Sequence, residues 1–303
     1  MAESPLIVVV GDATLDIHVH PTMRVRPRGD VPADIRLGPG GQGANVAVRL
    51  ARRGHRVRLV CGIADDAAGR IIRAALETDG VTLHDLGAGA SGAVIVLLDA
   101  DGDRTMLSHR APLGGRLDTA AVADAEWLIV SGYVLAEREQ KGLEAAAPHI
   151  GRRIVLGCSL EPSQAPAWAD AVASLRPHLT ILNDAEAATL AGVDERPVAL
   201  SRRIGDRLGG LAIVSHRAGA TVAVGNDDVE VELPAAGRAV DTTGAGDALA
   251  AGVVSSLIGA DWPPDAGQMR LTLAAAIETA ADVASLAGAQ ARTRLEPGGT
   301  VPS

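Results

Sequence analysis

The sequence predicts an α/β fold: a three-layer αβα sandwich with a mostly parallel central sheet and a small β lid. Short runs rich in β-branched residues alternate with longer Ala-, Leu- and Arg-rich stretches of helical period. Such alternation is typical of βαβ units with helices on both faces of the sheet. In a chain of 303 residues, 47 % hydrophobic residues supply enough apolar surface for a large buried core.

The strands are predicted from six short apolar runs. They are LIVVV at 6–10, VRLVC at 57–61, WLIVS at 127–131, IVLGC at 154–158, LTIL at 179–182 and LAIVS at 211–215. Helices are expected between them, at 43–53, 67–79, 137–147, 184–191 and 197–208. The segment 221–233 instead predicts an antiparallel hairpin at the sheet edge, turned at Gly225 to Asp228.

Two segments break this alternation. Residues 13–38 have no helical period, and residues 93–109 predict a hairpin with an Asp-Gly turn. We expect them to form the β lid, with boundaries 13–38 and 91–112, over the carboxyl edge of the sheet. Because no long linker divides the chain, we expect one domain over residues 1–303.

Composition and charge exclude several function classes. The chain has no Phe, one Tyr and three Trp, and its net charge is -9. Nucleic-acid and membrane binding are therefore not expected. A basic cluster at Arg49, Arg52, Arg53, Arg56 and Arg58 is interpreted as a solvated helix end. The run 6–10 is too short for a signal peptide or a membrane span, so a cytoplasmic location is expected.

Asp241-Thr-Thr-Gly-Ala-Gly-Asp247 is the strongest motif, because it leads into an Ala-rich stretch of helix length. The backbone of Gly244, Ala245 and Gly246 can point successive N–H groups at an anion, and the helix dipole adds partial positive charge. The Asp247 carboxylate beside that anion hole can accept a proton from a hydroxyl. Alternatively, Asp247 only complements the helix dipole.

A second glycine-rich turn, Gly38 to Asn45, opens the helix expected at 43–53. It satisfies G-x-G-x-x-G, but the strand and acidic residue of a dinucleotide site are missing, which disfavours a NAD-linked oxidoreductase. Backbone at Gly41 can approach a polyol closely, and the Asn45 amide offers a donor and an acceptor to hydroxyls. Asn45 is alternatively a helix-start residue that bonds local backbone.

Carboxylates follow two predicted strands. Asp12 and Asp16 come after the first strand, where each can accept hydroxyl hydrogen bonds, although Asp12 is equally a turn residue. Asn183 and Glu186 follow LTIL at a spacing that predicts a capping box. The alternative is that Glu186 orders water around a phosphate-bound magnesium ion. The eight His and two Cys show no metal-ligand spacing.

In order and spacing, GGQGAN at 40–45, NDAE at 183–186 and DTTGAGDALAAG at 241–252 resemble the ribokinase-like (PfkB) carbohydrate and nucleoside kinases. The resemblance implies a ribokinase-like fold, ATP and magnesium as cofactors, and phosphorylation of a hydroxyl on a sugar-like small molecule. It assigns catalysis to Asp247 with the anion hole of Gly244, Ala245 and Gly246. The remaining implied sites are substrate contacts at Asp12, Asp16, Gly41, Gln42 and Asn45, nucleotide contacts at Asn183, Ser215, Gly219 and Thr242, magnesium at Glu186, and a monovalent cation such as potassium at Asp241.

The chain departs from the family pattern at three positions. Gln42 stands where ribokinases usually have Lys, Arg217 replaces a glycine near the nucleotide, and Ile277 lies where an Asn is common. The substrate therefore need not be ribose. A nucleoside kinase, a sugar-phosphate kinase and a catalytically silent metabolite sensor stay open as alternatives, as does a homodimer formed through the lid.

Overall fold

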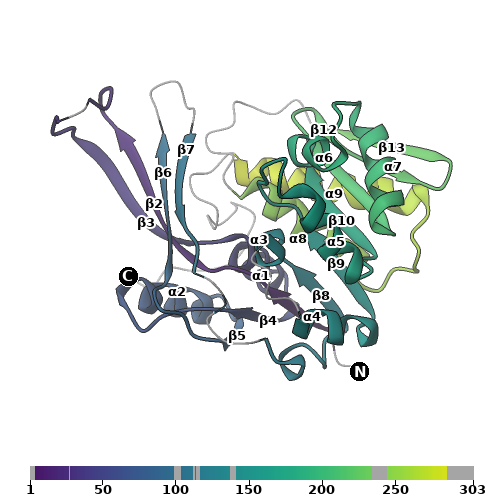
Figure 1. The fold of residues 1–303 in the computed structure, drawn as a ribbon, viewed down its shortest axis with the longest axis horizontal. Coiled ribbons are helices and arrows are strands. Elements are labelled where there is room, and N and C mark those ends of the chain that lie inside the picture. The colour runs from purple at the N-terminus through teal and green to yellow at the C-terminus, as the bar shows by residue number, and fades with distance from the viewer. Residues whose placement is uncertain are drawn as a thin grey trace, which may run out of the picture.

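The computed structural model describes residues 4–26, 28–98, 104–111, 113, 117–136, 141–233 and 244–284. Its centre is a nine-stranded sheet of order β13-β12-β11-β10-β9-β8-β1-β4-β5 (Figure 1). Seven strands are parallel, and β12 and β13 add an antiparallel hairpin at one edge. The parallel strands are β1 (Leu6–Val10), β4 (Arg56–Cys61), β5 (Thr82–Asp85), β8 (Trp127–Val130), β9 (Arg152–Leu156), β10 (Leu179–Asn183) and β11 (Leu211–His216); the hairpin is β12 (Gly219–Val224) and β13 (Asp227–Glu232).

Helices cover both faces of this sheet. One apolar cluster joins the sheet to α1 (Gln42–Arg52), α2 (Ala67–Thr78), α8 (Ala245–Leu257) and α9 (Ala266–Ala284). A second cluster joins the other face to α3 (Gly132–Ala136), α4 (Lys141–Ala146), α5 (Ala165–Ser174), α6 (Asp184–Ala191) and α7 (Pro197–Leu208), with short 3-10 turns η1 (Thr119–Ala121) and η2 (Ala147–His149). The predicted fold class is confirmed. Among the described helices, none has the length and apolarity to cross a membrane.

Local sequence signals explain where several helices start and stop. Pro197 occupies the first turn of α7, and Gly209 ends it in the left-handed conformation at φ 82°. α1 lies against β1 because Gly11 and Gly43 face each other; a Cβ on Gly43 would come within 2.6 Å of the Gly11 Cα. This contact sets the start of α1 directly beside the carboxyl end of β1.

Several elements differ from the prediction. β5, α3 and α5 were not predicted, and the helix expected at 137–147 is described only as α4, since residues 137–140 lie outside the described ranges. The α5 sequence APAWADAVAS has a weak amphipathic pattern, because Ala dominates both of its faces. Its position is set by Trp168, whose indole Nε1 donates to the Gly132 carbonyl oxygen at 2.9 Å.

A second sheet of four strands stands out from the main body (Figure 1). Its order is β3 (Ala33–Gly40), β2 (Thr14–Pro21), β6 (Gly92–Leu98) and β7 (Arg104–His109). β2 pairs with β6 in parallel, while β2–β3 and β6–β7 are antiparallel. Along β2, Thr14, Asp16 and His18 are buried and alternate with half-buried apolar residues. The two faces of this sheet therefore differ in character.

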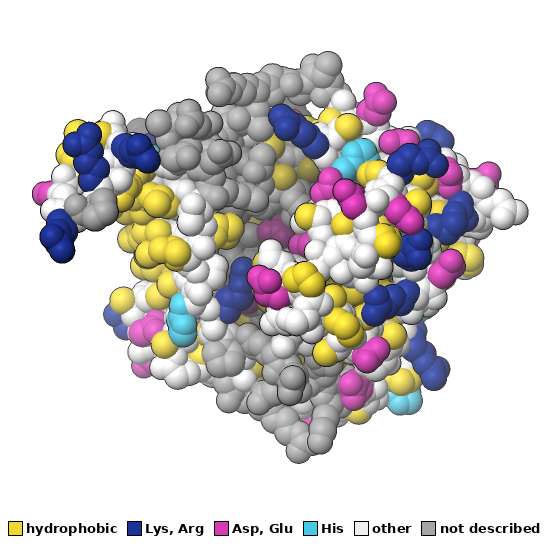
Figure 2. All heavy atoms as spheres, turned by 45° about the horizontal axis from the view of Figure 1, so that its top comes forward, with side chains coloured by type: hydrophobic (Ala, Val, Ile, Leu, Met, Phe, Trp, Pro, Cys, Tyr) yellow, Lys and Arg dark blue, Asp and Glu magenta, His cyan; other side chains and the backbone are white. Residues whose placement is uncertain are grey.

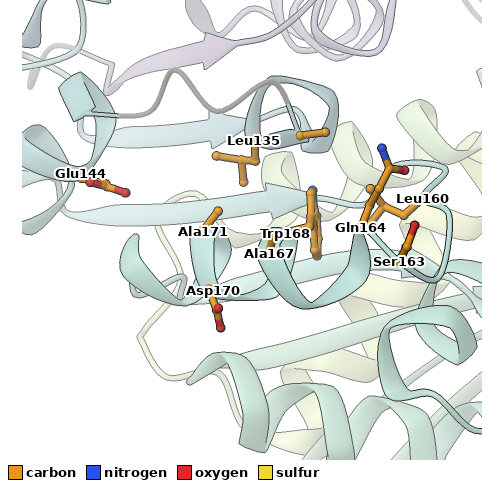
Figure 3. A pocket seen from close by; sticks show the side chains of 10 residues that line it. Leu135, Glu144, Leu160, Ser163, Gln164, Ala167, Trp168, Asp170 and Ala171 are labelled. Carbon is orange, nitrogen blue, oxygen red and sulfur yellow. The ribbon is translucent and has the colours of Figure 1, made fainter.

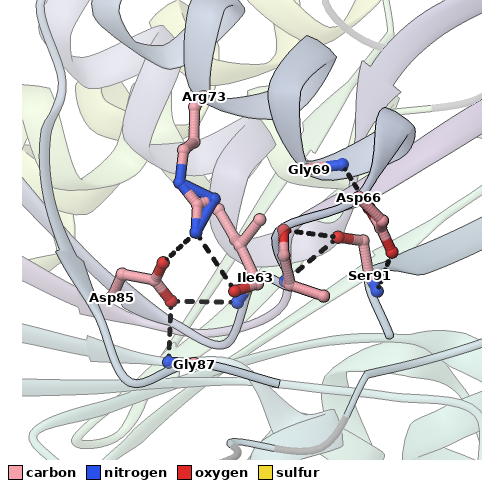
Figure 4. A network of polar contacts seen from close by, with 8 residues as sticks. Ile63, Asp66, Gly69, Arg73, Asp85, Gly87 and Ser91 are labelled. Carbon is pink, nitrogen blue, oxygen red and sulfur yellow. Dashed lines mark hydrogen bonds and ion pairs between the residues drawn. The ribbon is translucent and has the colours of Figure 1, made fainter. Parts of the chain in front are cut away.

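A network of polar contacts ties the start of β6 to the main body (Figure 4). The Asp66 carboxylate caps α2 by accepting from Gly69 N at 2.7 Å, and it also accepts from Ser91 N at 2.9 Å. Ser91 Oγ accepts from Ala64 N at 3.1 Å. Nearby, Asp85 pairs with Arg73 and accepts from Ile63 N at 3.0 Å. The base of the second sheet is thus fixed to α2 and to the loop after β4.

Candidate active site

A pocket of about 260 Å³ opens at the carboxyl ends of the parallel strands, next to the start of α8. This is the edge where ligands of parallel α/β sheets collect. It brings together residues from five separate parts of the sequence. The lining is Gln42, Leu156, Gly157, Ile181, Leu182, Asn183, Glu186, Ser215, Gly244, Gly246, Asp247, Leu249 and Ala250.

The first turn of α8 presents backbone to this pocket. Gly244 is the N-cap at φ 77°, a left-handed conformation that favours glycine, and no side chain caps the helix. A Cβ on Gly246 would meet open space. Since the first amides of a helix have no intrahelical acceptor, this turn can bind an anion. Asp241 and Thr242 of the same motif lie outside the described residues.

Asp247 lies in that first turn, and its carboxylate is held by α1. Asn45 Nδ2 donates to Asp247 Oδ2 at 2.8 Å. Burial raises the pKa of Asp247 from 3.8 to about 7, opposed by the Asn45 hydrogen bond and by the charge of Arg49, while Asp12 and Asp16 add to the increase. A carboxylate that titrates near neutral pH is suited to accept a proton from a hydroxyl.

Asn183 and Glu186 form the predicted capping box at the start of α6. Asn183 Oδ1 accepts from Glu186 N at 2.8 Å, and Glu186 Oε2 accepts from Asn183 N at 2.9 Å. Burial raises the pKa of Glu186. Gly157 leaves the room for this carboxylate, because a Cβ there would lie 2.3 Å from Glu186 Oε2. The capping role is therefore present, and Glu186 also borders the pocket.

Gln42 joins three chain segments rather than pointing freely into the site. Its Nε2 donates to the Gly157 carbonyl oxygen at 2.8 Å, and its Oε1 accepts from Ser131 Oγ at 2.7 Å and Gly132 N at 3.2 Å. The amide oxygen is thus committed to the ends of β8 and the start of α3. This network was not predicted, and it reduces what Gln42 can offer a substrate to its second N–H.

Asp12 is buried and also extensively bonded. Its carboxylate pairs with Arg110 and accepts from Gly43 N at 3.3 Å and Ser131 Oγ at 3.4 Å. The Arg110 guanidinium also stacks over the Tyr133 ring, 3.5 Å from the ring centroid. The contact of Arg110 with Asp12 and with Tyr133 was not predicted, because nothing in the sequence links Asp12 to a residue 98 positions away.

Asp16 lies on the buried face of β2. Thr14 Oγ1 donates to Asp16 Oδ1 at 2.7 Å, while burial raises the pKa of Asp16. Gly40 on the paired strand β3 makes room for it, since a Cβ there would lie 2.1 Å from Asp16 Oδ2. Asp16 is therefore placed by the small second sheet, whereas Asp12 is placed by the main sheet.

The remaining predicted contacts, Gly41, Ser215 and Gly219, lie in different surroundings. Gly41 has φ 95° and lies over the Asp12 backbone, where a Cβ would be 2.7 Å from the Asp12 carbonyl oxygen. Ser215 lines the pocket, and its Oγ donates to the Leu182 carbonyl oxygen at 3.3 Å. Gly219 does not line it; a Cβ there would lie 2.0 Å from the Val231 carbonyl oxygen in the β12–β13 hairpin. The hairpin alone accounts for this glycine.

The interpretation of the basic cluster as a solvated helix end is wrong for Arg49, which is 4 % exposed. The sequence places it among charged neighbours, but helical geometry turns it inward one turn after Asn45. Other members of the cluster do lie at the surface side of α1 and β4. Arg52 pairs with Asp79 at 2.7 Å, and Arg58 pairs with Asp124 at 2.6 Å.

A second hollow of about 460 Å³ lies among α3, α4 and α5 (Figure 3). Leu135, Trp168 and Ala171 form its apolar part, with Glu144 and Asp170 among its polar side chains. No residue of the predicted site lines it. Several residues of the predicted site instead line the smaller pocket, among them Asp247 and Glu186.

Comparison with known proteins decides the family. Residues 4–302 match the model of the pfkB family carbohydrate kinases. The chain belongs to the pfkB family of carbohydrate kinases. It is therefore a phosphotransferase that acts on a hydroxyl of a sugar, and the predicted family is confirmed.

Individual relatives agree with this membership. A fructokinase of Klebsiella pneumoniae is 28 % identical over 291 residues, which are 89 % of this chain and 90 % of that protein. Fructokinase-1 of Oryza sativa subsp. japonica is 34 % identical over 127 residues, covering 41 % of this chain and 38 % of that relative. The solved structure of Arabidopsis thaliana ribokinase complexed with ribose and ATP superposes with a TM-score of 0.75 at 20 % identity, covering 95 % of each chain.

Proposed function

We propose that this kinase transfers the γ-phosphoryl group of ATP to a hydroxyl of a small sugar or sugar derivative, with Asp247 as general base. The observation that carries the proposal is the Asp247 carboxylate, held by Asn45 at the uncapped first turn of α8. A base and an anion hole within four residues supply both requirements of in-line transfer. The ATP complex of the Arabidopsis relative supports ATP as the donor.

The acceptor and the donor would approach Asp247 from opposite sides. On the acceptor side, Asp12, Asp16 and Asn45 offer oxygen and amide groups to hydroxyls, and Gly41 allows close approach of the backbone. On the donor side, Asn183 and Ser215 end the adjacent strands β10 and β11, which pair in register at these two residues. The γ-phosphoryl group would then sit over the amides of Gly244, Ala245 and Gly246.

Magnesium would be held mainly through phosphate and water, with Glu186 as the carboxylate nearest the donor side. Among the described residues, no group of three or more His, Cys, Asp or Glu could hold a metal by itself. One half-buried carboxylate at the pocket fits Mg²⁺, which keeps most of its waters and binds substrate phosphates. The ion would neutralise charge on the phosphates. Asp241, the proposed ligand of a monovalent cation such as potassium, lies outside the described residues.

A free sugar fits the acceptor side better than the alternatives. A nucleoside kinase needs a surface for the base, and Tyr133 is already covered by Arg110. A sugar-phosphate kinase needs a cation beside the acceptor, and Arg110 there is already paired with Asp12. A catalytically silent sensor has no use for a base beside an anion hole. Arg217, whose presence suggested that alternative, is exposed in the turn between β11 and β12.

The decisive experiment measures ATP consumption with a panel of free sugars, sugar acids, sugar phosphates and nucleosides. The control is Asp247→Asn, whose amide can still accept from Asn45. We expect turnover with at least one free sugar and a loss of about 10²- to 10⁴-fold in kcat for the control. Ligand-induced stabilisation without turnover would support the sensor. Turnover that survives Asp247→Asn would reject the proposed base.

We also propose that two copies pair through their lids. Ile35, Leu37, Ile95 and Leu107 are 37 to 61 % exposed, and the strand register places them on one face of the second sheet (Figure 2). A second copy would cover this apolar face with an identical one. Leu107→Glu should convert the dimer to a monomer in light scattering, and a monomeric wild type would reject the pairing. Use of ATP would place the enzyme in the cytoplasm.

A further inference from the structure

We propose that Arg49 is a positioning residue that keeps the Asp247 carboxylate in its charged, proton-accepting form. This inference rests on the proposed role of Asp247 as the base. Arg49 does not need to touch the substrate for this task. It acts through Asp247, on the same helix that supplies Asn45.

Arg49 lies close in the fold to the residue that holds Asp247. It follows Asn45 by four residues in α1, so both side chains lie on the same face of that helix. α1 packs against α8, which carries Asp247, and Arg49 is 4 % exposed. A guanidinium buried this deeply between two helices is rare unless a charge or hydrogen bonds compensate it.

Several charged groups surround Asp247. Asp12 after β1 and Asp16 on β2 both oppose its ionisation, as does burial. Asn45 and Arg49, both on α1, favour the charged form, and Glu186 on α6 lines the same pocket. Burial raises the pKa of Asp247 to about 7 even with Arg49 present. Without that cation the pKa would rise further, so a smaller fraction of the carboxyl would be ionised and able to accept a proton at neutral pH.

Packing alone does not explain an arginine at position 49. Burial lowers the pKa of Arg49 from 12.5 to about 10, and the charge of Asp247 opposes this change. Arg52 and Arg53 on the same helix disfavour the Arg49 charge further. A buried Met or Leu would fill the same volume without this desolvation cost. Burial of the Arg49 charge therefore lowers the stability of the fold, while the same charge favours the ionised form of Asp247.

The test compares Arg49→Gln with Arg49→Lys, and uses Arg53→Gln as the matched control. Arg53 is the C-cap residue of α1, four residues after Arg49, and its Nη2 donates to Thr279 Oγ1 at 2.9 Å. The readout is kcat/KM against pH with the best sugar of the panel, because this profile reports the base of the free enzyme. ATP titrates identically in all variants, so differences between profiles belong to the protein.

We expect Arg49→Gln to move the acidic limb upward by about one pH unit, the usual size for loss of a neighbouring opposite charge. Its rate should be about tenfold below wild type at pH 6 and close to wild type at pH 9. Arg49→Lys and Arg53→Gln should keep the wild-type limb. A rate that falls equally at every pH, or a Lys variant that shifts as far as the Gln variant, would overturn the proposal.

A second readout decides the matter without any turnover. Carboxyl ¹³C NMR of Asp-labelled protein follows the Asp247 titration directly, with Asp247→Asn providing the assignment. If no sugar is phosphorylated but the Asp247 resonance titrates at higher pH in Arg49→Gln, the proposed function fails while the coupling holds. If the resonance titrates as in wild type, the coupling is wrong whatever the activity. Arg49→Met serves the same comparison should Arg49→Gln not fold.

Discussion

Replacement of Asp247 by Asn should make the protein more stable while it lowers kcat by about 10²- to 10⁴-fold. Burial raises the pKa of Asp247 from 3.8 to about 7, so the folded state holds a proton that the unfolded chain releases at lower pH. Because the pKa of this carboxyl is raised in the folded state, the free energy of unfolding falls as the pH rises from about 4 to 7, and it falls no further above pH 7. Asn has no such proton, and its amide oxygen can accept the same bond from Asn45.

The size of this effect follows from the two pKa values. A difference from 3.8 to about 7 corresponds to a free energy of unfolding on the order of 4 kcal/mol. Asp247 keeps some exposed surface in the pocket, where water relieves part of this cost, so we expect about half, about 2 kcal/mol. The variant should therefore gain several degrees in Tm at pH 8 and little at pH 4.

Urea unfolding of wild type and Asp247→Asn at pH 4, 6 and 8 measures this directly. Asn45→Ala is the matched control for damage to the α1–α8 contact, and it should lower stability at every pH. An Asp247→Asn variant that gains nothing between pH 4 and pH 8 would refute the reasoning. It would mean that the carboxyl is well solvated and titrates near its ordinary value.

Three further predictions concern the pocket wall and the lid base. Gly157→Ala places a Cβ against the Glu186 carboxylate, so it should lower the free energy of unfolding in urea by about 1 to 3 kcal/mol. It should also weaken ATP binding measured by calorimetry. An unchanged ATP affinity would show that Glu186 does not belong to the donor site. Glu186→Gln keeps an acceptor for Asn183 N, so the melting temperature should change little while the Mg²⁺ concentration for half-maximal activity rises; an unchanged Mg²⁺ requirement would reject the magnesium role. Asp66 accepts backbone hydrogen bonds from Ser91 and Gly69 that lower its pKa to about 2, so its stabilisation is lost as the pH falls from about 4 to 2. Because Asp66→Asn takes up one proton fewer on unfolding, its acid transition in circular dichroism should be less steep between about pH 4 and pH 2, and an identical transition would show that this carboxylate does not couple to folding.

Sequence patterns predicted those parts of the fold that local signals control. The bounds of α7 follow from Pro197 at its start and Gly209 at its end, and β1 follows from five consecutive apolar residues. The capping box of Asn183 and Glu186 was readable for the same reason, since its partners are three residues apart. α5 was missed because its Ala-rich sequence carries little period, and its place depends on packing against α3.

The sequence did not predict how the residues of the candidate site are connected to one another. Gln42 was expected to contact substrate, yet its amide joins Ser131 and Gly157, which are 89 and 115 residues away. Arg49 was interpreted as a surface charge among other arginines, but its side chain is buried. In both cases the outcome depends on which face of α1 meets the sheet and α8. No local pattern carries that information.

The charges of the acceptor side argue for a neutral substrate. Three carboxylates, Asp12, Asp16 and Asp247, influence one another there, and each is compensated differently. Arg110 pairs with Asp12, Thr14 donates to Asp16, and Asn45 with Arg49 supports Asp247. A sugar phosphate or sugar acid would add negative charge to a region whose cations are already used. A neutral polyol adds only hydroxyls, which donate to carboxylates of any charge state, so a free sugar is the acceptor that this arrangement favours.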